Sequence, residues 1–178
     1  MNIDGRKLQK WNDIVASVDK ITDRLEMPVD EKIKPVVVGL MALGFKTVNS
    51  CEGHLDYGRA HPAVDIETDY LARPWGDGPP PKDPPSAWVD YCRDARAFIR
   101  PTVKRAFDLL EEFYKDRDVH HDARIVVFSG GISGMTIENG YGQITQWLSD
   151  SGQAERLKEY QEEMLAFGEF LKNKFFQS

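Results

Sequence analysis

The chain has 178 residues, 41% of them hydrophobic, which suits one globular core and is short for two full domains. A formal net charge of −6 argues against a protein that coats nucleic acid, and two cysteines are too few for a disulfide scaffold. No charged-then-apolar leader opens the chain and no apolar run approaches the ~20 residues of a membrane span, so we expect one domain over residues 1–178, in the cytoplasm and not in a membrane.

The first predicted element is a long amphipathic helix. Apolar residues recur at three- and four-residue steps from Leu8 to Leu25, which is one face of a helix. Pro28 follows and cannot continue it. We therefore expect a helix over residues 5–26.

A second helix is predicted over residues 31–43. Asp30 can cap its beginning, and Gly44 can stop it. Pro35 lies about one turn inside this range, where the proline ring would clash with the preceding turn of the helix. Either the helix begins nearer Lys34 or its first turn is kinked.

Two short alternating segments follow, over residues 45–50 and 63–68. Apolar and polar residues alternate in each, as in strands with one buried face. Because the two strands flank the segment 51–61, we expect that segment to form a loop at one end of a sheet.

Residues 69–85 are predicted to form a proline-rich surface loop, because six prolines lie between positions 74 and 85. It is either a plain connection or a lid or partner-binding segment. A helix over residues 86–115 comes next, and Pro101 either kinks it or divides it into two.

The helix at 86–115 carries an apolar stripe and a group of cations. Cys92 and Phe107 belong to the stripe, so we expect Cys92 to be a buried, inert thiol, and Cys51 the more reactive one. The cations are a solvated face or a site for a phosphate-bearing ligand: Arg93, Arg96, Arg100, Lys104 and Arg105.

The last elements are two strands and a helix. Strands are predicted over residues 124–129 and 135–139, joined by a glycine-rich turn that lacks the P-loop lysine. A long helix over residues 152–175 closes the chain, and its apolar stripe either packs on the sheet or pairs two copies into a homodimer. Strands in hairpin-like pairs separated by helices predict an α+β fold, with a mostly antiparallel sheet of about four strands.

The reactive residue types concentrate in residues 49–54. Cys51 and His54 have the two-residue gap of paired zinc ligands, and His61, with Asp56 or Asp65, could complete the set. A thiolate and imidazoles favour zinc over magnesium. In such a site a carboxylate at Glu52 could move protons to and from a metal-bound water.

The same residues also fit two other interpretations. Cys51 could be a nucleophile with His54 as base and Glu52 or Asp56 to orient the ring, although His120 or His121 could equally supply the base. Alternatively, the polar groups only hydrogen-bond their own loop. In either functional case, a small-molecule ligand would meet four further residues: Asn49, Ser50, Gly53 and Asp65.

Residues 50–54 resemble two known motifs. The closer is the Ser-Cys-Glu-Gly-His loop of small microbial and phage proteins without an assigned activity, which implies no reaction. More distantly, residues 34–67 resemble the wybutosine-synthesising tRNA methyltransferase family, whose stretch reads Ser-Cys-Ser-Gly-Arg. The chain departs from that family at Glu52 and His54, so the family's arginine is missing.

Three functions remain open from the sequence. One is a small enzyme with its site at Cys51, acting with metal assistance on a small or nucleotide-type substrate. Another is a non-catalytic binding or regulatory module. The third is a nucleic-acid-modifying enzyme, which would need the cations of residues 93–105 on the same side as Cys51.

Overall fold

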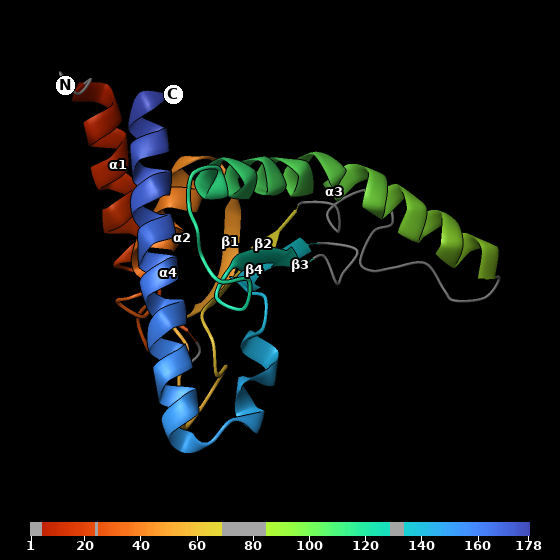
Figure 1. Cartoon of the computed structure of the whole chain (residues 1–178). Helices are drawn as coiled ribbons and strands as arrows, with labels where there is room; N and C mark the ends of the chain where they lie inside the picture. Colours follow the sequence, from red (N-terminus) through yellow and green to blue (C-terminus); the bar gives the residue numbers. More distant parts are fainter. Residues whose placement is uncertain (1–4, 24, 69–84, 129–133) are drawn as a thin grey trace.

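The computed structural model describes residues 5–23, 25–68, 85–128 and 134–178. In chain order its elements are α1 (Gly5–Val18), α2 (Lys34–Ala42), β1 (Lys46–Cys51), β2 (Ala63–Glu67), α3 (Pro85–Tyr114), β3 (Ile125–Phe128), β4 (Gly134–Asn139), the 3-10 helix η2 (Gly142–Trp147) and α4 (Asp150–Gln177). The strands form an antiparallel four-stranded sheet in the order β1-β2-β4-β3 (Figure 1). The predicted α+β class, with its antiparallel sheet and long C-terminal helix, is confirmed.

The helices α1, α2 and α4 gather on one side of the molecule, and α3 runs across the sheet with its first half extending away from it (Figure 1). Helix α2 packs against both α1 and α4. Two glycines allow the close approach of α2 and α4, since a Cβ at Gly39 would lie 2.6 Å from Leu171 Cβ and one at Gly168 would lie 2.7 Å from Pro35 Cβ. No helix among the described residues is both long and apolar enough to cross a lipid bilayer.

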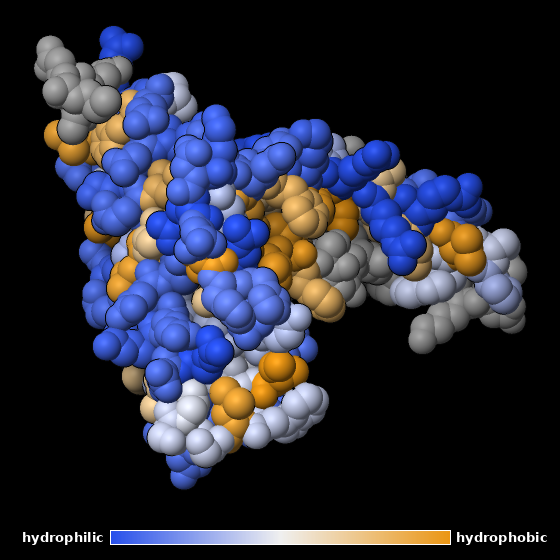
Figure 2. All heavy atoms as spheres, viewed as in Figure 1, coloured by the Kyte–Doolittle hydropathy of each residue, from blue (hydrophilic) through white to orange (hydrophobic). Residues whose placement is uncertain are grey.

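The core lies between these helices and one face of the sheet. Val64 of β2 and Ile137 of β4 are register partners and are fully buried. The apolar stripe of α4 joins the same core through Met164, Phe167 and Leu171, while hydrophilic residues cover its outer face (Figure 2). The stripe therefore packs within this chain, chiefly on α2, whereas one predicted alternative placed it on the sheet.

The predicted helix over residues 5–26 is wrong in its second half. Helix α1 ends at Val18, and an isolated antiparallel bridge joins Thr22 to Pro28. The Asp23 carboxylate accepts hydrogen bonds from the backbone N–H groups of Leu25 (2.7 Å) and Met27 (2.9 Å). A side chain that captures local N–H groups in this way competes with helix formation, so the apolar periodicity continues past the helix itself. We call residues 22–28 the 22–28 turn.

Pro35 and Pro101 each left two alternatives open in the sequence, and the structure decides between them. Helix α2 begins at Lys34, so Pro35 lies in its first turn, where the missing N–H has no helical partner to lose. Helix α3 continues through Pro101 as one helix. The predicted proline-rich loop, apart from Pro85, and the glycine-rich turn, apart from Gly134, lie outside the described residues. The 3-10 helix η2 was not predicted.

The predicted apolar stripe of α3 is partly wrong. Phe107 is 52% exposed and Cys92 is only half-buried, whereas Tyr91 and Phe113, which were not assigned to the stripe, are buried. The helix continues unbroken through Pro101 and buries different faces in its two halves. Tyr91 belongs to a small separate cluster and Phe113 to the main core, so a single stripe cannot describe both.

Candidate metal centre

The loop after β1 is closed at its base by the sheet. Cys51, the last residue of β1, pairs with Ala63, the first residue of β2. Gly53 and Gly58 adopt positive φ angles of 86° and 69°, which only glycine takes up without strain. The sheet and these two turns fold residues 52–62 back over the end of β1.

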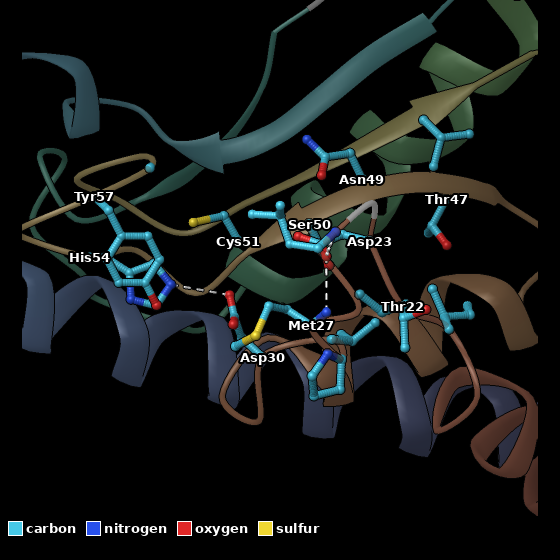
Figure 3. A pocket seen from close by; sticks show the side chains of 17 residues that line it. Thr22, Asp23, Met27, Asp30, Thr47, Asn49, Ser50, Cys51, His54 and Tyr57 are labelled. Atoms are coloured by element: carbon cyan, nitrogen blue, oxygen red, sulfur yellow. Dashed lines mark hydrogen bonds and ion pairs between the residues drawn. The ribbon is translucent and has the colours of Figure 1, made fainter.

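Three side chains from different elements meet beside this loop: Asp30, Cys51 and His54. One ligand atom of each lies within 4.8 Å of the other two, and all three residues are partly buried. His54 Nε2 is 3.3 Å from Asp30 Oδ2, the contact drawn as a dashed line in Figure 3. The loop and the segment before α2 thus present a carboxylate, a thiol and an imidazole to one point.

Asp30 is brought to the site by reciprocal hydrogen bonds with the loop. The backbone N–H of Glu52 donates to Asp30 Oδ2 at 3.0 Å, and the backbone N–H of Lys32 donates to Glu52 Oε2 at 2.9 Å. Asp30 does not cap α2, which has no side-chain cap. The Glu52 carboxylate thus holds residues 30–32 against the loop.

Helix α4 fixes the backbone of the same loop. The buried Gln161 donates through Nε2 to the carbonyl oxygens of Glu52 (3.1 Å) and Gly53 (3.4 Å), and its Oε1 accepts from Lys32 Nζ at 2.6 Å. Gly53 leaves no room for a side chain, since a Cβ there would lie 2.5 Å from Leu157 Cδ1 of α4. Gly53 therefore acts in packing the loop on α4.

The cysteine sulfur has few strong partners. The backbone N–H of Gly53 donates to Cys51 Sγ at 3.4 Å, and the carbonyl oxygen of Arg59 lies 4.0 Å from it. A weak N–H contact stabilises a thiolate only slightly. The sulfur is thus available to a cation that would sit between it, Asp30 and His54.

A cleft of about 320 Å³ opens beside the three side chains, between β1 and the 22–28 turn (Figure 3). Cys51, His54 and Asp30 line it together with Ser50 and Asn49. The volume falls at the lower end of the range of small-molecule sites. Of the four residues predicted to meet a ligand, Asn49 and Ser50 line this cavity, whereas Gly53 and Asp65 do not.

The site has a negative electrostatic environment. Tyr57 stacks on the His54 ring, with centroids 4.1 Å apart. Desolvation raises the pKa of Tyr57, and negative charge at Asp30, Asp56, Cys51 and Glu52 raises it further. A cation placed here would offset the repulsion among the carboxylates Asp30, Glu52 and Asp56.

His61 belongs to a different group of residues. Its Nε2 lies 3.2 Å from Glu138 Oε2 of β4, and Gln143 donates to Glu138 Oε1 at 3.0 Å. The bond to His61 is the largest cause that lowers the pKa of Glu138. His61 therefore contacts Glu138 of the sheet and is not grouped with Cys51 and His54.

Asp65 is likewise engaged within the sheet. It accepts hydrogen bonds from Thr136 (2.7 Å), Arg59 (2.8 Å) and Asn49 (3.1 Å). Burial by itself would raise the pKa of Asp65, but these bonds outweigh it and hold the pKa below its ordinary value. Asp65 is thus a saturated structural acceptor, and it constrains the side chain of Asn49.

His120 and His121 form a second group with Asp122 and do not join Cys51. Their ligand atoms also lie within 4.8 Å of one another, but both histidines are exposed. Asp122 also lies 3.7 Å from the Arg156 guanidinium, which repels a cation. Among the described residues, the group at Cys51 is the better-enclosed metal candidate.

Sequence reasoning missed Asp30 as a site residue. It lies 21 positions before Cys51 and was interpreted as a helix cap because of its place before an apolar run. No local pattern connects it with the loop, since the connection is made by the Glu52 N–H and by the packing of α2 beside β1. Only the tertiary structure reveals the third member of this candidate metal-binding group.

No protein-family model, curated protein or solved structure matches this chain. The two motif resemblances of residues 50–54 therefore stay predictions.

Proposed function

We propose that this protein binds a zinc ion through Asp30, Cys51 and His54 and uses it to hydrolyse a ligand held in the adjoining cleft. The observation that carries the proposal is the convergence of three ligand atoms within 4.8 Å at the edge of a cavity. Three protein ligands with a remaining open position are typical of catalytic zinc, whereas structural zinc takes four.

The donor set matches zinc in type and in charge. A thiolate and an imidazole favour zinc over magnesium or calcium, which prefer oxygen ligands. With Cys51 and Asp30 ionised and His54 neutral, the ligands carry two negative charges and balance a divalent ion. Tetrahedral ligands lie about 3.5 Å apart, so side-chain movements of about 1 Å would close the site around the ion.

A covalent mechanism through Cys51 is the second candidate, and it fits the geometry less well. In a Cys–His–Asp relay the imidazole stands between the sulfur and the carboxylate, which separates them by a ring and two hydrogen bonds. Here Asp30, Cys51 and His54 place all three ligand atoms around one point. Convergence of this kind supports coordination of an ion.

The nucleic-acid alternative has weaker support. Arg93 forms an ion pair with Asp90, and Lys104 forms one with Asp108 on the same helix. Arg105 donates to the carbonyl oxygen of Leu43 and lies over the Phe45 ring. Three of the five cations predicted to meet a phosphate are thus engaged within the chain.

The zinc would supply a nucleophile at neutral pH. A bound zinc ion lowers the pKa of a coordinated water to about 7 and polarises a ligand carbonyl, so a separate general base is not required. The open coordination position would face the cleft, since the three donors line its wall. Glu52 and Gln161 would keep the donors in place without touching the ion.

The test is the zinc content of the purified protein, measured by elemental analysis after dialysis against a weak chelator. The proposal predicts about one zinc per chain, lost in the Asp30→Asn, Cys51→Ser and His54→Ala variants. His121→Ala is the matched control, because it removes an exposed histidine of the other group and should keep the zinc. Thermal unfolding of each variant separates metal loss from misfolding. Zinc that survives in all three ligand variants would contradict the proposal.

A further inference from the structure

The cleft at the metal centre runs along the outer edge of β1. This strand is the first in the order β1-β2-β4-β3, and it pairs only with β2 among the described strands. Five consecutive residues, 47–51, line the cleft. Since neighbouring side chains of a strand point to opposite faces, a cavity that touches all five must border the edge of the backbone itself.

Both walls of the cleft present apolar side chains that a protein normally buries. Leu25 and Met27 of the 22–28 turn are 80% and 58% exposed, and Val48 of β1 is 54% exposed. All three line the cleft. Val48 lies at an irregularity in the register with β2, so it has no cross-strand partner there. Exposed apolar groups beside an unpaired strand edge are typical of a surface that binds another chain.

The charges of the described cleft residues favour one class of substrate. They include the acids Asp23 and Asp30 and no lysine or arginine. Phosphate and carboxylate groups are usually bound by cations or by helix N-termini, so a nucleotide would find no counter-charge among these described residues other than the metal. An uncharged or cationic substrate suits these walls.

We propose that the substrate is an extended peptide that adds to the outer edge of β1 and places one of its carbonyl groups at the metal. The proposal rests on the zinc site proposed above. Main-chain hydrogen bonds to the strand edge would supply affinity, and the pocket between Val48, Leu25 and Met27 would select an apolar side chain. Cys51 ends β1, so a peptide aligned with residues 47–50 reaches the metal at the end of the strand.

The reaction is a hydrolysis. The oxygen of a water at the metal bonds to the peptide carbonyl carbon, the carbon–nitrogen bond breaks, and the departing nitrogen receives a proton from that water. One water is consumed and no electrons are transferred. The side chains around Cys51 hold the ion, and the edge of β1 holds the peptide.

The first experiment uses a pool of blocked octapeptides with the zinc-loaded protein, and mass spectrometry identifies the fragments. Peptides with an apolar residue next to the cleaved bond should be cleaved, and those rich in aspartate and glutamate should not. Each cleaved peptide is then remade with N-methyl groups on alternate backbone amides away from the cleaved bond. Pairing with a strand edge uses every second amide, so one methylated set should abolish cleavage and the other should keep it.

The second experiment compares Val48→Asp with Ile144→Asp. Both side chains are about half exposed, but only Val48 lines the cleft. Val48→Asp should reduce peptide turnover about tenfold or more, because a bound apolar side chain would meet a charge, while Ile144→Asp should leave it unchanged. Both variants should keep their zinc.

The outcomes separate the two proposals. Suppose that the protein loses its zinc on His54→Ala. If the parent protein cleaves no peptide, or if both sets of N-methyl groups reduce cleavage equally, the peptide inference is overturned and the metal site still stands. A purified protein without zinc would contradict both proposals. Cleavage of a phosphate ester in place of peptides would contradict the charge argument for the cleft.

Discussion

His54 and His61 lie seven residues apart in one loop, and the structure gives them opposite surroundings. His54 faces a cleft, where a carboxylate and a thiol from two other segments approach it. His61 is buried against the sheet, and its Nε2 contacts Glu138, which Gln143 also holds. One histidine belongs to an open set of ligands, and the other to a closed pair.

The difference shows that residue type and spacing do not identify a metal ligand. Both histidines have an acidic partner, yet only His54 has a further donor, Cys51, and a cavity beside it. His61 belongs to no group of three candidate donors among the described residues, although its Nδ1 is buried without a hydrogen-bond partner. The convergence of three donors beside a cavity therefore separates His54 from His61.

The largest effect should come from exchanging the two histidines for alanine, one at a time. His54→Ala removes one of three ligands, so zinc affinity should fall by at least about 100-fold. His61→Ala should keep the zinc affinity and instead lower the stability of the fold, because Glu138 loses its buried partner. Competition with a coloured chelator measures the affinities. Equal loss of zinc in both variants would contradict the different roles given to His54 and His61.

Gly142→Ala should damage the closed side of the loop without touching the metal. A Cβ at Gly142 would lie 2.1 Å from Cγ of His61, so ring and helix η2 must move apart. We expect a loss of about 3 kcal/mol in the free energy of unfolding, measured by urea denaturation. Gly5→Ala is the control, because nothing lies within 4 Å of its added Cβ. Unchanged stability in Gly142→Ala would mean that His61 is not packed there.

Gln161→Ala should weaken the open side indirectly. Its amide fixes the carbonyl groups of Glu52 and Gly53, so its loss should loosen the loop and lower zinc affinity about tenfold. Glu162→Ala is the matched control, since it removes an exposed neighbour on the same helix. A drop in thermal stability with full zinc affinity would assign Gln161 to the fold alone.

The smallest effect concerns the pH dependence of the closed pair. The pKa of Glu138 is lowered in the folded state, so its contribution to stability is fully present above the ordinary value of 4.5 and is lost as the pH falls through the folded pKa. Glu138→Gln should therefore cost about 1 kcal/mol at pH 7. The difference from the parent protein should shrink below pH 4.5 in denaturation curves. A constant difference down to pH 3 would contradict this ionic contribution.

Much of the fold could be predicted because its signals are local. The alternation in β2 and the apolar stripe of α4 follow directly from strand and helix periods, whereas β1 lacks the predicted buried face, since Val48 is 54% exposed. The end of α1 could not be predicted in the same way. Ile21 and Leu25 continue the helical spacing, but the Asp23 carboxylate captures the N–H groups that a helix would use.

The candidate site could be located from the sequence but not completed. Cys51 and His54 were indicated by their spacing, because the loop that joins them is short. Asp30 and Gln161 reach the loop from 22 and 109 positions away in the chain, measured to their contacts with Glu52. Glu138, the partner of His61, lies 77 positions after it in the chain. Such contacts depend on how the elements pack, which residue spacing does not encode.

X-ray absorption at the zinc edge can test whether Cys51, His54 and Asp30 hold one zinc ion, because it resolves the types of atoms bound to the metal. We expect one sulfur at about 2.3 Å and lighter N and O ligands at about 2.0–2.2 Å, with the sulfur absent in Cys51→Ser. A zinc bound only by nitrogen and oxygen in the parent protein, as the exposed histidines beside Asp122 would give, would contradict it.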